Sequence, residues 1–199
     1  MWNERYAVGE YVYGTDPNLF LKENAHRLKS PVLSLAEGEG RNAVYLASQG
    51  LQVHAVDASE VGLDKAKKLA LARGVEITTE IADLMNFKPE PNTYGSVISI
   101  SAHLPSAIRR VLYPLVEQSL VEGGIVLLEA YSEEQFGRDS GGPKDLDMLM
   151  SVEKIVKEFP NCEPIHLQQL ERDVTEGIYH KGNASVVQFI GRKTAQGTS

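Results

Sequence analysis

The sequence predicts an α/β protein with a Rossmann-like, doubly wound sheet of seven strands, mostly parallel and with one antiparallel strand in a C-terminal hairpin. Apolar runs alternate with helical patterns between residues 32 and 130, which is typical of a parallel sheet with helices on both faces. The first apolar run ends in a glycine turn, and the second ends in an aspartate. The last two strand-like runs have no helix between them, so one of them must run against the sheet.

The first helix is expected to begin at Asp16-Pro17, with the aspartate as N-cap and the proline at the first helical position, and to run to about Leu28. Five strands follow, at Val32–Ala36, Val53–Asp57, Glu76–Ala82, Ser96–Ser101 and Ile125–Ala130. Three helical patterns between these strands begin at Arg41, Ser59 and Ser106. The first two stop at Gly50 and Gly74, and Pro114 is expected to kink the third.

The last third of the chain begins with a polar, glycine-containing loop, Arg138–Asp147, which is expected to act as a lid or as a plain surface loop. A short helix, Val152–Phe159, comes next. Two strands are then predicted at Ile165–Val174 and Ser185–Ile190. The segment His180-Lys181-Gly182-Asn183 between them is typical of a hairpin turn.

Composition limits the classes of function. The chain has 199 residues, 42% of them hydrophobic and 24% charged, with a net charge of −7 and no long basic run. Nucleic acids and anionic membranes need clustered cations, so neither is an expected partner. Cys162 is the only cysteine, no apolar run is long enough to cross a membrane, and the N-terminus lacks the features of a signal peptide. We therefore expect a cytoplasmic protein, monomeric or homodimeric.

The glycine turn indicates a nucleotide-like ligand. Residues 38–43 fit the pattern G-x-G-x-x-A between a strand and a helix, and Asp57 follows Gly38 by 19 residues, near the spacing at which a carboxylate meets ribose hydroxyls. Glu37 and Glu39 flank the turn and would repel the pyrophosphate of NAD. They suit the cationic S-adenosylmethionine better, although both could instead point outward and stabilise the helix dipole.

Two further charged residues are candidates for the same ligand. Arg41 lies in the first turn of its helix, where a cation is unfavourable without a carboxylate partner. That partner is either the methionine carboxylate of the ligand or Glu37 or Glu39. Asp83, just after the third strand, is placed to accept the adenine amino group, with the backbone of Leu84 beside the same ring. The alternative for Asp83 is an ordinary loop aspartate.

These features together resemble the class I S-adenosylmethionine-dependent methyltransferases, over nearly the whole chain from about Trp2 to Lys193. The turn with Gly40-Arg41-Asn42 and an apolar helix resembles the tellurite-resistance-type branch. Four other segments are also similar to that branch: Tyr11-Val12-Tyr13-Gly14, His103-Leu104-Pro105, Gly141-Gly142-Pro143 and Tyr179-His180-Lys181-Gly182. Two positions depart from the family pattern. Ser34 stands where an acid is usual, with Glu37 as a possible replacement, and Ala36 stands where the first glycine is usual.

The resemblance implies one methyltransferase domain over residues 1–199. It consists of an N-terminal arm and helix (1–30), a cofactor-binding half (31–131), and an acceptor-side loop, helix and terminal hairpin (132–193). The cofactor is S-adenosyl-L-methionine, and S-adenosyl-L-homocysteine is the product. The implied cofactor-binding residues are Tyr13, Ala36, Glu37, Gly38, Gly40, Arg41, Asp57, Ala58, Ala82, Asp83, Leu84, Ile100 and Ser101. No metal is expected.

The expected reaction is in-line methyl transfer to a small-molecule nucleophile, a thiol or a chalcogen oxyanion. The protein then has mainly to position and desolvate the reactants, and a base is needed only where the acceptor must lose a proton. His103, just after the fourth strand, and His180, in the hairpin connection, are the candidate catalytic residues, each with a purely structural role as the alternative. Tyr131 is expected on the acceptor side. The competing functions are a non-catalytic S-adenosylmethionine-binding protein and an NAD-linked reductase.

Overall fold

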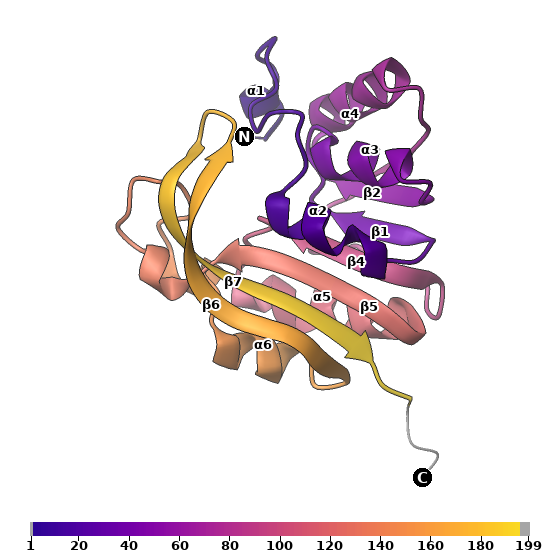
Figure 1. Cartoon of the computed structure of the whole chain (residues 1–199), viewed down its shortest axis with the longest axis vertical. Helices are drawn as coiled ribbons and strands as arrows, with labels where there is room; N and C mark the ends of the chain where they lie inside the picture. Colours follow the sequence, from indigo (N-terminus) through magenta and orange to yellow (C-terminus); the bar gives the residue numbers. More distant parts are fainter. Residues whose placement is uncertain (1, 196–199) are drawn as a thin grey trace.

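The structure, a computed structural model, describes residues 2–195 and forms one seven-stranded sheet in the order β3-β2-β1-β4-β5-β7-β6 (Figure 1). The strands are β1 Val32–Leu35, β2 Val53–Asp57, β3 Thr78–Ile81, β4 Tyr94–Ile100, β5 Leu120–Tyr131, β6 Cys162–Glu176 and β7 His180–Lys193. Strands β1 to β5 pair in parallel, whereas β7 runs antiparallel to both β5 and β6. The predicted fold class is therefore confirmed.

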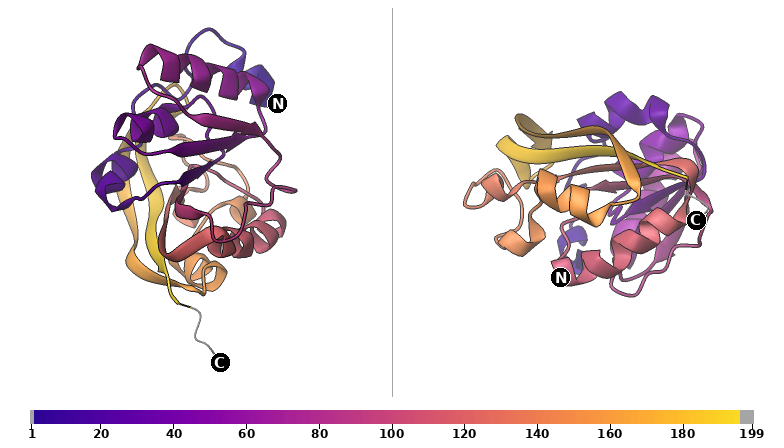
Figure 2. Two further views of the ribbon diagram at one scale, coloured as in Figure 1. Left: turned by 90° about the vertical axis from the view of Figure 1, so that its right-hand side faces the viewer. Right: turned by 90° about the horizontal axis from the view of Figure 1, so that it is seen from below.

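Helices cover both faces of this sheet, as the turned views in Figure 2 show. They are α1 Trp2–Tyr6, α2 Leu19–Asn24, α3 Arg41–Ser48, α4 Glu60–Ala72, α5 Ser106–Ser119 and α6 Val152–Glu158, with short 3₁₀ turns at Ala25–Arg27, Glu133–Gln135 and Leu146–Met148. One buried apolar cluster joins α2, α3 and α4 to one face, and another joins α5 and α6 to the other. Alternate residues of β1 supply them: Val32 belongs to the first cluster, and Leu33 and Leu35 to the second. Within residues 2–195, no helix has the length and apolar character that a bilayer span requires.

The predicted start of the first helix is wrong by two residues. The helix begins at Leu19, and Asn18 is its N-cap, because the Asn18 side chain accepts a hydrogen bond from the Leu21 amide at 3.0 Å. The α-helix also ends at Asn24, before a 3₁₀ turn, rather than running to Leu28. Asp16-Pro17 therefore lies outside the helix that its sequence pattern predicts.

The terminal hairpin is longer than predicted, and its turn lies elsewhere. Glu176 pairs with His180, so residues 177–179 form the turn, where Gly177 has a φ of +72°. His180-Lys181-Gly182-Asn183 belongs to β7 instead. Strand β5 also starts earlier than predicted, at Leu120, and α1 was not predicted. Helix α5 continues through Pro114.

The topology opens a crevice at the carboxyl ends of β1 and β4. Connections leave these neighbouring strands toward opposite sides of the sheet, since β1 is followed in the sheet by β2 and β4 by β5. Ligands of open α/β sheets bind at such a point. Ala36 and Ser101 follow the two strands there, and both have positive φ angles, +51° and +55°. Such angles cost non-glycine residues about 1–2 kcal/mol, so this edge of the sheet is locally strained.

Candidate active site

A cavity of about 830 Å³ fills this crevice. Its walls come from the N-terminal arm, the glycine turn, the ends of β2 to β4, the loop around residues 139–148 and the tip of the hairpin. Most of the predicted site residues line it: Tyr13, Ala36, Glu37, Arg41, Asp57, Ala58, Asp83, Leu84, Ile100, Ser101, His103 and His180. Gly38, Gly40 and Ala82 do not. The structure thus brings together residues from both ends of the sequence, from Tyr13 to His180.

The two turn glycines serve the packing of the protein itself. Both have positive φ angles, +67° at Gly38 and +95° at Gly40. A Cβ atom on Gly38 would lie 2.7 Å from the Tyr6 hydroxyl, and one on Gly40 would lie 2.7 Å from the Cα and Cβ atoms of Ala66 in α4. The turn is therefore shaped by contacts with the arm and with α4 in addition to any ligand.

Asp57 ends β2 with its carboxylate held by two backbone amides. The Gly38 and Ser59 amides each donate a hydrogen bond of 2.8 Å, one to each carboxylate oxygen. Burial raises the pKa of Asp57, and the amide hydrogen bonds oppose that rise. Each oxygen has a second lone pair, so the carboxylate can also accept hydrogen bonds from a ligand in the cavity.

Glu37 is buried and caps helix α3. Its Oε1 accepts hydrogen bonds from the amides of Asn42, at 3.1 Å, and Ala43, at 2.8 Å, and its Oε2 accepts one from the Ser34 hydroxyl. Burial raises the pKa of this carboxyl group against the effect of those bonds. Glu37 thus reaches the side chain of Ser34, the position where the family usually has an acid.

Glu39 ties the N-terminal arm to the glycine turn. Its Oε2 accepts a hydrogen bond from the Val12 amide at 2.8 Å, and its Oε1 pairs with the Lys65 ammonium at 2.8 Å. Lys65 also donates to the carbonyl groups of Val8 and Glu10. Since Glu37 and Glu39 are 7% and 4% exposed, the alternative that both acids point outward is wrong.

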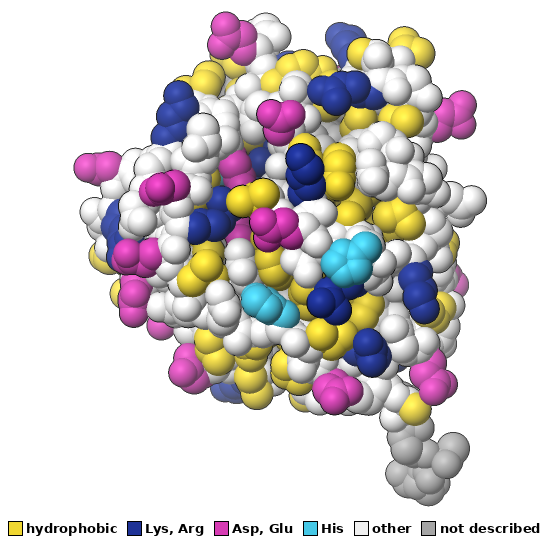
Figure 3. Space-filling view, in the orientation of Figure 1, with side chains coloured by type: hydrophobic (Ala, Val, Ile, Leu, Met, Phe, Trp, Pro, Cys, Tyr) yellow, Lys and Arg dark blue, Asp and Glu magenta, His cyan; other side chains and the backbone are white. Residues whose placement is uncertain are grey.

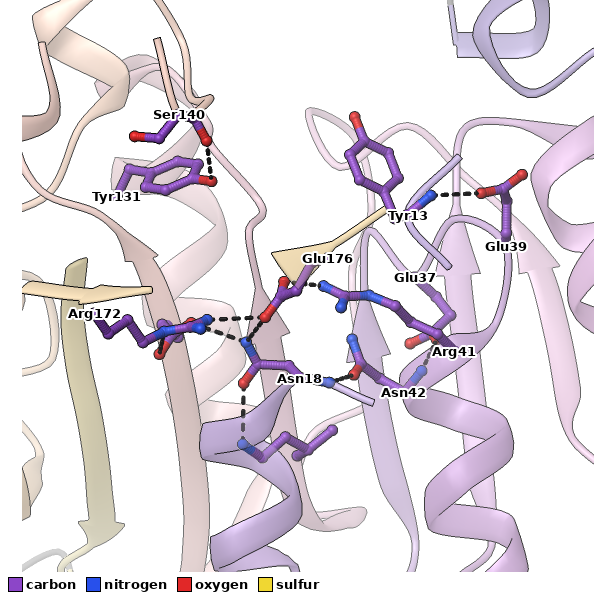
Figure 4. A network of polar contacts seen from close by, with 12 residues as sticks. Tyr13, Asn18, Glu37, Glu39, Arg41, Asn42, Tyr131, Ser140, Arg172 and Glu176 are labelled. Atoms are coloured by element: carbon purple, nitrogen blue, oxygen red, sulfur yellow. Dashed lines mark hydrogen bonds and ion pairs between the residues drawn. The ribbon is translucent and has the colours of Figure 1, made fainter. Parts of the chain in front are cut away.

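Arg41 pairs with neither Glu37 nor Glu39. Its guanidinium forms an ion pair of 2.6 Å with Glu176, the last residue of β6 (Figure 4). Glu176 also accepts hydrogen bonds from Arg172 and from the Asn18 side chain. Arg41 and Arg172 together lower the pKa of Glu176 to about 2, although burial alone would raise it. The expected internal partner of Arg41 was therefore wrong, because the true one lies 135 residues along the chain.

The two candidate histidines are both neutral at pH 7. His103 stacks on Tyr131, and its Nε2 accepts a hydrogen bond of 2.9 Å from the Tyr131 amide. Burial and the nearby His180 lower the pKa of His103 to about 3. Burial, with smaller effects of nearby arginines, lowers the pKa of His180 to about 4, even though Glu176 opposes this. The His180 Nδ1 atom is buried and has no hydrogen-bond partner among the described residues.

Tyr131 does not reach the cavity wall. It is 3% exposed and packs against His103 on one side and His180 on the other, with ring centroids 5.2 and 5.3 Å away. Gly141 lies close to the same rings, since a Cβ atom there would be 2.9 Å from the Tyr131 hydroxyl and 3.0 Å from a His180 carbon. Tyr131 therefore supports both histidines from behind.

Helix α1 contributes three cavity residues that were not predicted as site residues, Trp2, Arg5 and Tyr6. The sequence contains a pattern that could have indicated this helix, because Trp2 and Tyr6 are four positions apart and so share one helical face. In the structure the centroids of their rings lie 5.8 Å apart. Tyr179, at the hairpin tip, was predicted only as part of a similar segment. The arm and the hairpin tip thus both line the cavity.

Comparisons with known proteins agree with this geometry. Residues 32–124, which form the strands and helices of the glycine-turn half, match the family model described as "Methyltransferase domain". This part of the chain is therefore similar to a methyltransferase domain. A search of curated proteins found no match for the chain.

The chain resembles solved structures of the same fold. One, from work on the conversion of a disulfide bond into a thioacetal group during echinomycin biosynthesis, has a TM-score of 0.77 and 15% identity, covering 99% of this chain and 92% of that one. TehB from Haemophilus influenzae has a TM-score of 0.72 and 16% identity, covering 97% of this chain and 66% of that one. A methyltransferase from Methanosarcina mazei has a TM-score of 0.71 and 13% identity, covering 91% and 100%. At these identities the likeness shows the fold.

S-adenosylmethionine is the cofactor of such a domain, and the cavity fits it. The volume lies within the usual range for ligand sites, about 300–1,000 Å³. The wall includes three acidic residues, Glu37, Asp57 and Asp83, which suit a ligand that carries a sulfonium, an ammonium and ribose hydroxyls. Within residues 2–195, no group of three histidine, cysteine or acidic residues could hold a metal ion.

Substituting Gly40 by alanine tests the contact with α4. We expect Gly40→Ala to lower the free energy of unfolding by about 2 kcal/mol more than Gly50→Ala does, because the new methyl group overlaps Ala66. Gly50 is the matched control, since its φ is +87° and nothing lies within 4 Å of an added Cβ. Urea unfolding of both variants measures the difference, and equal losses would show that Gly40 is required only for its backbone angle.

The histidine environment predicts a dependence of stability on pH. Above about pH 6.5 the His180 side chain is neutral in both the folded and the unfolded chain. As the pH falls from about 6.5 to about 4, the unfolded chain binds a proton that folded His180 does not, so the free energy of unfolding falls by up to about 3 kcal/mol from this group. His180→Asn removes that part of the slope.

Chemical denaturation at several pH values between 4 and 7.5 measures this slope. His26→Asn is the control, because His26 is exposed and lies outside the site, and we expect it to keep the wild-type slope. Equal slopes for wild-type protein and His180→Asn would contradict the assignment.

Proposed function

We propose that this methyltransferase transfers the methyl group of S-adenosylmethionine to a small-molecule nucleophile, a thiol or a chalcogen oxyanion. One observation carries the proposal. The cavity that contains Asp57 and Asp83 continues without interruption to His103 and His180, where the arm, the 139–148 loop and the hairpin tip enclose it. An acceptor must therefore fit within a partly enclosed cavity of about 830 Å³, which favours a small molecule over a protein or nucleic acid.

We propose the following contacts on the cofactor side. Asp57 accepts hydrogen bonds from the ribose hydroxyls, and Asp83, beside the backbone of Leu84, accepts one from the adenine amino group. Glu37 faces the ammonium group. Tyr13, Ala36, Ala58, Ile100 and Ser101 complete the wall around the methionine and adenosine parts. The position of each side chain at this one cavity supports these roles.

The Arg41–Glu176 pair limits what Arg41 can do for the cofactor. Because the Glu176 carboxylate lies 2.6 Å from the Arg41 guanidinium, part of the charge of Arg41 is already neutralised within the protein. The guanidinium still lines the cavity and has further N–H donors. We propose that it donates one of these to the methionine carboxylate while Glu176 holds its position.

The bound cofactor supplies an electrophilic methyl group on a sulfonium that leaves as a neutral thioether. An electron pair of the acceptor forms the new bond to the methyl carbon, and the pair of the breaking carbon–sulfur bond stays on sulfur. The residues of the protein then need to hold the acceptor in line and exclude water. The apolar side chains of Ile100, Leu104 and Ile108 on the cavity wall serve the second task.

The histidines have unequal roles in this proposal. The Nε2 atom of His103 already accepts the Tyr131 amide, so His103 orients Tyr131 and shapes the wall. His180 lines the cavity, but its low pKa makes it a weak base. We propose that His180 orients the acceptor through a hydrogen bond, and that the acceptor reacts as an anion or loses its proton to solvent.

Two other functions remain to be tested against this proposal: a non-catalytic S-adenosylmethionine-binding protein and an NAD-linked reductase. The buried acids at the glycine turn support a cationic ligand over a pyrophosphate. One similar fold was solved in work on a reaction at sulfur, which supports thiols among the acceptors. The proposed location is the cytoplasm, and the proposed assembly is a monomer or homodimer.

Calorimetry followed by an acceptor screen tests the function. We expect S-adenosylhomocysteine to bind and NADH not to bind, and the reverse result would establish the reductase. Transfer of a radiolabelled methyl group is then measured with thiols, selenite and tellurite as acceptors. Binding of S-adenosylhomocysteine with no transfer to any of these acceptors would favour the non-catalytic alternative.

Removing the charge of Asp57 tests the cofactor site. We expect Asp57→Asn to weaken the binding of S-adenosylhomocysteine by about 1.5–3 kcal/mol, the range for a hydrogen bond to a charged group. Asp64→Asn on the exposed face of α4 is the control, and it should bind like the wild type. Calorimetry gives both affinities, and circular dichroism checks that each variant is folded. An unchanged affinity in folded Asp57→Asn would exclude the proposed ribose contact.

A further inference from the structure

We propose that the methyl acceptor carries an anionic group apart from its nucleophile, and that Arg5 binds this group at the mouth of the cavity. The acceptor class that follows is a small thiol that also bears a carboxylate. The inference rests on the proposed function for the identity of the nucleophile. The site for the anion rests on the surroundings of Arg5 alone.

Arg5 is held at the cavity by aromatic rings. Its guanidinium carbon lies 4.9 Å from the centre of the Trp2 ring and 5.1 Å from the centre of the Tyr179 ring, and Nη1 donates a hydrogen bond of 3.1 Å to the Tyr13 hydroxyl. These contacts position a long, flexible side chain between the arm and the hairpin tip. Aromatic rings contact a guanidinium through its π face, so they leave its in-plane N–H donors available to a ligand.

Arg5 forms no ion pair among residues 2–195, although Asp139 also belongs to the cavity wall. The other arginine of the wall, Arg41, is paired with Glu176 at 2.6 Å. Of the two arginines on the cavity wall, Arg5 is therefore the one whose charge is not paired with a carboxylate of residues 2–195. A planar guanidinium with free donors matches a carboxylate in both charge and geometry.

The position of Arg5 relative to His180 determines the shape of the acceptor. Tyr13 stands between them, because its hydroxyl contacts Arg5 while its ring centroid lies 4.8 Å from that of His180. The positive charge of Arg5 also contributes to the lowered pKa of His180, which agrees with this proximity. A molecule with its nucleophile near His180 and its anion at Arg5 must span one tyrosine side chain. A compound with two separate functional groups satisfies this better than a compact oxyanion.

The test compares two probes that differ in one charge, 3-mercaptopropionate and its methyl ester. Ligand-observed NMR titrations measure the dissociation constant of each probe for the protein saturated with S-adenosylhomocysteine. The proteins are wild type, Arg5→Gln, Arg5→Lys and the control Arg73→Gln. Arg73 is an exposed residue at the end of α4, outside the cavity, so its loss changes the net charge equally.

We expect wild-type protein and Arg73→Gln to bind the anionic thiol about tenfold more tightly than the ester, and Arg5→Gln to lose this preference. Arg5→Lys should keep only part of it, because an ammonium lacks the planar pair of donors. In methyl-transfer kinetics, Arg5→Gln should have a higher KM for the anionic thiol than the wild type, with kcat little changed. Trp2, the only tryptophan of the chain, gives a fluorescence signal beside Arg5 in the wild type.

The outcomes separate this inference from the proposed function. Equal binding of the two thiols by the wild type, or a preference that survives in Arg5→Gln, overturns the anion site. Methyl transfer at equal rates to both thiols in all four proteins would leave the proposed function standing without it. A preference for the anion that depends on Arg5, with no methyl transfer to either thiol, would support the anion site and contradict the thiol acceptor.

Discussion

The buried ion pair between Arg41 and Glu176 is the interaction on which the site depends. Arg41 begins helix α3 directly after the glycine turn, and Glu176 ends β6, so the pair joins the cofactor side to the hairpin. Behind it, Glu129 of β5 pairs with Arg172 and accepts hydrogen bonds from the side chains of Asn18 and Gln188. The two carboxylates and two guanidinium groups balance in charge. Breaking one such buried pair typically costs about 3–5 kcal/mol, because the remaining charge stays desolvated.

This network holds the glycine turn in its conformation without the help of a ligand. A cation in the first turn of a helix is unfavourable, and here Glu176 offsets it while Glu37 accepts hydrogen bonds from the amides at the start of the same helix. Glu39 and Lys65 meanwhile hold the arm over the turn. The cavity is therefore preorganised by the protein's own side chains, so a ligand binds without the cost of ordering this part of the chain. On the face of the molecule drawn in Figure 3, acidic and basic side chains are interspersed.

The sequence predicted those features that depend on local pattern, and it failed where distant residues decide. Alternating apolar runs and helices were enough for the strands, the crossover helices and the place of Asp57, because each follows from a periodicity or a spacing. The start of α2 could not be predicted, because it depends on distant residues. The side-chain amide of Asn18 donates hydrogen bonds to the carboxylates of Glu129 and Glu176, which lie 111 and 158 residues away in the sequence. The hairpin was predicted too short because β6 lies at the edge of the sheet, where its polar, largely exposed residues carry no strong alternation.

The neutral histidines bear on how the site selects its acceptor. A sulfonium is a good leaving group, so the reaction gains little from a strong base and much from correct placement. His103 uses its ring nitrogen to hold the Tyr131 backbone, and His180 is kept uncharged by burial and by nearby arginines. Neither takes a proton readily at pH 7, so the nucleophile must arrive as an anion or lose its proton to solvent. Selection then falls to contacts away from the reacting atoms, and the unpaired charge of Arg5 at the mouth is the group best suited to make them.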